Sequence, residues 1–102
     1  MLYMIISTHS PESCPITNPK SMEKMIFSNQ HMDEIAKKLG VTVKGMWADM
    51  GAHTTFALLD APKPELLGQM AVELRLMEWN TSFTHPVITL EEAMAVLQQQ
   101  KK

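Results

Sequence analysis

The chain has 102 residues, 45 % hydrophobic and 20 % charged, which is typical of one globular domain and excludes a disordered chain. The net charge is −2 and no cluster of Lys and Arg is present, so we expect neither nucleic-acid nor membrane binding. A single cysteine, Cys14, excludes an intrachain disulfide. Because no signal-peptide pattern or membrane-spanning apolar run occurs either, we expect a cytoplasmic protein.

The first third of the chain predicts a strand, a loop and a helix. Residues 2–9 are rich in β-branched and large apolar side chains, and Ser10-Pro11 ends this strand. Three prolines within residues 10–20 forbid a regular element there. An apolar stripe at helical spacing predicts a helix over 21–39, which Gly40 ends.

The remaining residues predict a hairpin, a second helix, a strand and a terminal helix. The hairpin turns at Met50-Gly51, His85-Pro86 breaks the last strand, and Thr89 with Glu92 forms a capping box. The expected elements are strands over 41–49 and 53–59, a helix from Pro64 to about Met77, a strand over 78–84 and a helix through about Leu97. Ten methionines are interpreted as flexible core filling, with metal binding or a promiscuous binding surface as the alternatives.

This order of elements, βαββαβ followed by a terminal helix, predicts a single ferredoxin-like α+β domain over residues 1–102. Right-handed crossovers favour an antiparallel sheet of strand order 4-1-3-2, with both long helices on one face. The opposite face is then uncovered. An uncovered apolar sheet face favours self-association.

The topology predicts a candidate site at one end of the sheet. The end of the first strand lies beside the starts of the third and fourth strands, so His9, His53 and Glu78 gather there, with Asp49 close by. The loop that carries Cys14 leaves from the same end. Two imidazoles and a carboxylate suit a divalent transition metal such as Zn, Ni, Cu or Fe, which predicts a metal site at His9, His53 and Glu78.

The alternation of side chains also predicts which face the site occupies. We expect the helices to cover the more apolar residues Met4, Ile6, Phe56 and Leu58. The histidines then lie on the uncovered face. The expected ligand-binding residues on and around that face are Tyr3, Ser7, Trp47, Thr55 and Asn80.

Two other interpretations of the histidines stay open. An imidazole is also a general acid or base, so the protein is alternatively an isomerase or cofactor-free oxygenase with an apolar pocket lined by Met and by Trp47 or Trp79. In the other interpretation, the protein is a non-catalytic module, and its histidines form hydrogen bonds at a dimer interface. Cys14 is either a loop anchor or a reactive thiol.

Four segments carry a resemblance to a known family: MLYMIISTHSPESCP, AKKLGV, GMWADMGAHTTFALLDAP and THPVITLEEAM. Together they resemble the small GYD-domain-like proteins of the dimeric α/β-barrel superfamily, a group largely of unknown function. The resemblance implies a homodimer in which two sheets pack face to face, with higher assembly left open. Relatives include oxygenases, isomerases, haem enzymes and metal-binding proteins. No residue here matches a diagnostic catalytic motif of these relatives, so the resemblance assigns no catalytic residue.

Overall fold

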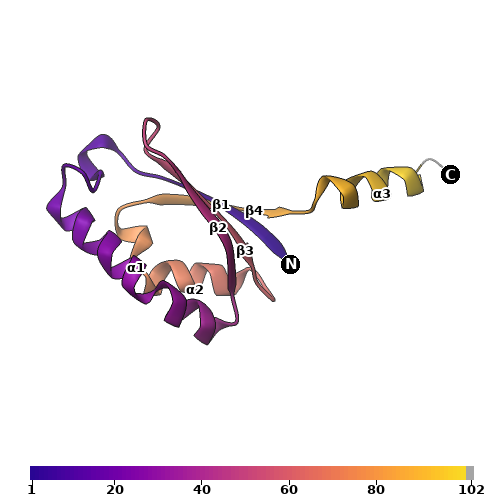
Figure 1. Cartoon of the computed structure of the whole chain (residues 1–102), viewed down its shortest axis with the longest axis horizontal. Helices are drawn as coiled ribbons and strands as arrows, with labels where there is room; N and C mark the ends of the chain where they lie inside the picture. Colours follow the sequence, from indigo (N-terminus) through magenta and orange to yellow (C-terminus); the bar gives the residue numbers. More distant parts are fainter. Residues whose placement is uncertain (101–102) are drawn as a thin grey trace.

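The computed structural model describes residues 1–100 and contains one antiparallel sheet of order β2-β3-β1-β4. Its strands are β1 (Leu2–Thr8), β2 (Thr42–Asp49), β3 (Thr54–Asp60) and β4 (Thr81–Val87). The helices are α1 (Pro19–Leu39), α2 (Glu65–Glu73) and α3 (Leu90–Gln100), with short 3-10 turns η1 (Pro11–Ser13) and η2 (Leu76–Glu78). Helices α1 and α2 lie on one side of the sheet, whereas α3 projects away from it (Figure 1). The predicted ferredoxin-like fold and strand order are confirmed.

Helix α1 has a well-defined start and end. The side chain of Asn18 accepts hydrogen bonds from the backbone N–H groups of Lys20 and Ser21, and Pro19 occupies the first helical position. Gly40 ends the helix with a φ of 71°, a left-handed conformation that glycine adopts at little cost. Within the helix, the buried Ser28 hydroxyl donates to the carbonyl of Leu74, which ties α1 to the end of α2.

The core lies between the sheet and these two helices, and its composition corrects the predicted faces. Tyr3 and Leu59, paired across β1 and β3, are buried in this core, as is the fully buried Leu74. The residues predicted to lie under the helices, Met4, Ile6, Phe56 and Leu58, lie on the opposite face instead. The prediction was wrong because both alternating sets of β1 are apolar, so hydrophobicity does not distinguish its two faces.

The last strand also differs from the prediction. Helix α2 ends at Glu73, and Arg75, with a φ of 61°, reverses the chain before η2. Strand β4 therefore begins at Thr81 rather than at residue 78. Pro86 lies within β4 rather than breaking it, because an edge strand tolerates a missing N–H donor. Within residues 1–100, no helix is both long enough and apolar enough to cross a membrane.

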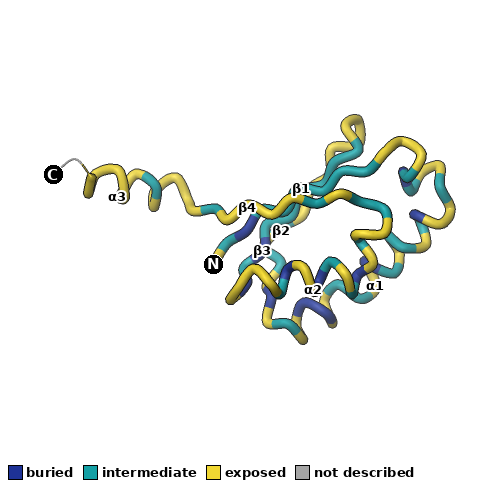
Figure 2. Tube along the Cα trace, turned by 180° about the vertical axis from the view of Figure 1, so that it is seen from behind, coloured by how far each residue is buried: buried dark blue, intermediate teal, exposed yellow. Residues whose placement is uncertain are grey.

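One sheet face and the terminal helix are left without a covering layer. Register pairing places Ile6 between Phe56 and Phe83 on this open face, and Trp47 lies opposite Phe56. Phe83 and Trp47 are 57 % and 55 % exposed. Helix α3 buries no residue, and most of its length is exposed (Figure 2).

The accessible surface and the radius of gyration are both larger than those of a compact monomer, which agrees with an uncovered sheet face and helix. The accessible surface is 7030 Å², whereas a compact monomer of this mass exposes about 5,800 Å². The radius of gyration is 15.7 Å, against about 13 Å for a compact chain of this length. The projecting α3 contributes to both differences.

Candidate metal centre

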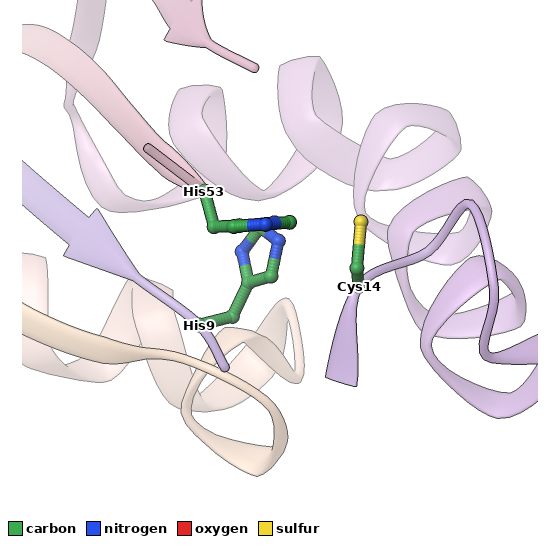
Figure 3. A group of neighbouring side chains, drawn as sticks. All are labelled: His9, Cys14 and His53. Atoms are coloured by element: carbon green, nitrogen blue, oxygen red, sulfur yellow. The ribbon is translucent and has the colours of Figure 1, made fainter. Parts of the chain in front are cut away.

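Three side chains of the types that coordinate transition metals meet at one end of the sheet. His9 directly follows β1, His53 directly precedes β3, and Cys14 lies in the loop between η1 and α1. Each offers one donor atom, and the three donor atoms all lie within 4.8 Å of one another. Figure 3 shows the Cys14 sulfur facing the two imidazole rings from across the site.

The sheet itself holds the two histidines together. Thr8 pairs with Thr54 as the last pair of the β1–β3 ladder, and the backbone N–H of His9 donates to the carbonyl of His53 at 3.1 Å. The two ring centroids are 5.3 Å apart in an edge-to-face arrangement. His53 has a φ of 51°, a left-handed conformation that is uncommon for residues other than glycine and is concentrated at functional sites.

The loop that presents Cys14 is tied to the start of α1. The carbonyl of Cys14 accepts the N–H groups of Thr17 and Asn18, and the side-chain amide of Asn18 donates to the carbonyl of Glu12. Cys14 itself is 7 % exposed and forms no disulfide. Asn18 therefore caps the helix and closes the loop that carries the thiol.

We expect Asn18→Ala to lower the free energy of unfolding by about 1 kcal/mol, because it removes the N-terminal cap of α1. Urea denaturation of the metal-free protein measures this change. Asn18→Asp is the matched control, since a carboxylate keeps the capping oxygen and should retain most of the stability. Equal stability of Asn18→Ala and the wild type would show that the cap contributes nothing.

The two ring nitrogens of His9 are shielded from solvent and lack hydrogen-bond partners among the described residues. The same holds for the indole nitrogen of Trp79, whose ring centroid lies 5.3 Å from that of His9. Burial lowers the pKa of His9 from its ordinary value, the nearby His53 lowers it further, and Asn80 opposes the shift. The lowered pKa favours the neutral form of His9, which is the form that coordinates a metal.

A cavity of about 220 Å³ adjoins the three donors. Its lining is mostly apolar and comes from the Cys14 loop, α1, the β2–β3 hairpin and the turn before β4. The side chains around the donors include Pro15, Ile16, Met22, Met25, Met50 and Trp79. An apolar lining lowers the local dielectric constant, which strengthens the attraction between a metal cation and its ligands.

Of the predicted metal ligands, the structure brings together His9 and His53 but not Glu78. The carboxylate of Glu78 lies 3.4 Å from the ammonium group of Lys24 and is absent from the donor group formed within residues 1–100. Asp49 lines the cavity, and its carboxylate accepts the N–H of Ala52. Cys14 takes the place of the third donor.

Four of the five predicted ligand-binding residues, Ser7, Trp47, Thr55 and Asn80, line a separate cavity of about 270 Å³ beside Trp79. Tyr3 is buried in the core, and of the five only Thr55 also lines the cavity next to the donors. The hydroxyl of Ser7 is 2.8 Å from that of Ser82, and the amide of Asn80 donates to the carbonyl of Leu76. These last two groups therefore already have partners within the protein.

Comparison with known proteins identifies the family. A family model described as "Domain of unknown function (DUF3303)" matches residues 1–101. A search of curated proteins gives no match. Among solved structures, the C-terminal domain of the MgtC protein from Mycobacterium tuberculosis is similar, with 17 % identity and a TM-score of 0.51 over 82 % of this chain and 84 % of that one. At this identity the likeness concerns the fold alone. The matching model is not named for the GYD domain, and the chain belongs to the DUF3303 family.

Proposed function

We propose that this protein binds one transition-metal ion per chain through His9, Cys14 and His53. The observation that carries the proposal is the grouping of two imidazoles and one thiol, drawn from three separate segments, with donor atoms within 4.8 Å of one another. A buried imidazole without partners costs roughly 1–3 kcal/mol. Coordination by His9 would offset part of that cost.

The donor chemistry favours borderline and soft metals. Imidazole and thiolate suit Zn, Cu, Fe and Ni, whereas Mg and Ca require oxygen ligands that this cluster does not supply. A bound metal deprotonates a coordinating thiol, so Cys14 would bind as the thiolate. Three protein ligands leave a further coordination position to be filled from the adjoining cavity, as in zinc sites that bind substrates rather than in closed structural sites.

Elemental analysis of protein purified without a tag or added metal tests the proposal. We expect close to one transition-metal ion per chain, removable with a chelator and restored by adding metal. Metal-free protein that also fails to bind Zn, Cu, Ni and Fe in titrations would contradict the proposal.

A catalytic role on a small organic molecule is the second candidate. It is supported by a further cavity of about 180 Å³ beneath the sheet, lined largely by apolar side chains that include Ile5, Met32 and Met46. A solidly packed interior would have argued against such a role. The same elemental analysis distinguishes the candidates. Metal-free protein would favour binding of an organic ligand or a role as a non-catalytic binding module.

We also propose that the protein forms a homodimer through the open sheet face, as in the dimeric α/β-barrel proteins that the sequence resembles. The surface in excess of a compact monomer is about 1,200 Å², and a typical stable interface needs about 800 Å² from each partner. The exposed apolar side chains of α3, including Leu90 and Leu97, add to the surface that a partner would cover. A reducing, cytoplasmic location fits the unpaired thiol of Cys14.

A further inference from the structure

We propose that the metal held by His9, Cys14 and His53 is copper, and that a methionine thioether from the same cavity completes its coordination. This inference rests on the proposed function, since it names the metal for the same three donors. The inference depends on three methionines, which line the cavity beside the donor group but are not members of that group.

The methionines reach the cavity from two segments of the chain. Met22 and Met25 are three residues apart on α1, a spacing that places both on one face of the helix. Met50 comes from the β2–β3 hairpin, close in sequence to His53. The same cavity thus contains imidazole, thiol and thioether donors from α1, the hairpin and the Cys14 loop.

The combination of donors favours copper over a structural zinc ion. Two histidines, one cysteine and a weakly bound methionine form a recognised copper-binding set, and thioethers are soft ligands that favour Cu(I). Structural zinc instead prefers four donors from Cys, His, Asp or Glu. Within residues 1–100 the donor group contains only three such residues, and the nearby Asp49 carboxylate already accepts a backbone N–H.

Charge in an apolar cavity favours the same metal. Cu(I) bound to one thiolate and two neutral imidazoles gives a site with no net charge, whereas Zn(II) with the same ligands leaves one positive charge. Burying an uncompensated charge is costly, and the one carboxylate among the residues that line the cavity, that of Asp49, is exposed to solvent and accepts the backbone N–H of Ala52. Glu78, the other acidic residue that the sequence places nearby, forms an ion pair with Lys24.

The test compares Cu(I) and Zn(II) binding to the full chain under anaerobic, reducing conditions. Cu(I) affinity is measured by competition with bathocuproine disulfonate, and Zn(II) affinity by competition with a chromophoric zinc chelator. The variants are Met22→Leu, Met25→Leu and Met50→Leu, which replace the thioether by a side chain of similar volume. Met94→Leu, on the projecting helix α3, is the matched control.

We expect at least one of the three cavity variants to lower Cu(I) affinity by about tenfold or more while Zn(II) affinity stays unchanged, and Met94→Leu to behave as the wild type. Unchanged Cu(I) affinity in all three variants, or Zn(II) binding as tight as Cu(I), would overturn the copper inference and leave metal binding intact. Failure of both metals to bind the wild-type protein would overturn the proposed function as well.

Discussion

Replacing either His9 or His53 by Ala, or Cys14 by Ser, is expected to lower the affinity of the protein for a transition metal by at least about 100-fold. Changing a residue that only supports a metal ligand already costs 10–100-fold in affinity, and each of these three side chains is itself one of three donors. Isothermal titration of the metal-free variants with Zn(II) measures the change.

Matched controls distinguish loss of a donor from a general effect on surface binding. His31→Gln removes a histidine of α1 whose ring N–H donates to the carbonyl of Phe27, away from the donor group. Ser13→Ala alters the residue next to Cys14 without touching a donor. Both controls should bind metal as the wild type does. A similar loss in the His31 variant would show that the measured binding is non-specific.

The meeting of the two histidines could be predicted because it depends only on strand order. In an antiparallel pair, the residue after one strand lies beside the residue before the other, and the Thr8–Thr54 pair shows this arrangement directly. His9 and His53 are the next residues outward. Helix periodicity and breaking residues supplied the element order, and the right-handed crossover rule supplied the sheet.

The third donor could not be placed in the same way. Cys14 lies in an irregular loop, where no periodicity indicates the direction of a side chain, and its position depends on contacts with Asn18 at the start of α1. Trp79, rather than the predicted Glu78, lies beside His9 for a related reason. The chain completes a 3-10 turn before β4, so the alternation expected from residue 78 does not apply there.

The face of the sheet was misassigned for a reason that bears on assembly. Both sets of alternating residues in β1 are apolar, which is unusual for a strand with one solvated face but expected for a strand covered on both sides. Helices α1 and α2 cover one side, with Tyr3 in the core. The second apolar set, around Ile6, Phe56 and Phe83, therefore fits the proposed homodimer, in which a second copy of the chain would cover it.

We expect Phe83→Glu to convert a dimer into a monomer. Phe83 is 57 % exposed in the single chain, so the substitution should leave the fold intact. In a twofold dimer through the open face, the new carboxylate would be buried twice, once from each chain, at a cost of several kcal/mol per ion. Size-exclusion chromatography with light scattering should show the mass falling from two chains to the 11.5 kDa of one.

Val72→Glu provides the matched control for this prediction. Val72 is 64 % exposed, and it lies on α2, on the other side of the sheet from Phe83. The same apolar-to-acidic change there should leave the dimer intact, because a new charge outside the proposed interface does not separate the two chains. A wild-type protein that is monomeric at tens of micromolar, or a Phe83→Glu variant that stays dimeric, would exclude the open sheet face as the interface. The apolar surface that Ile6 and Phe83 present would then require a partner other than a second copy of this chain.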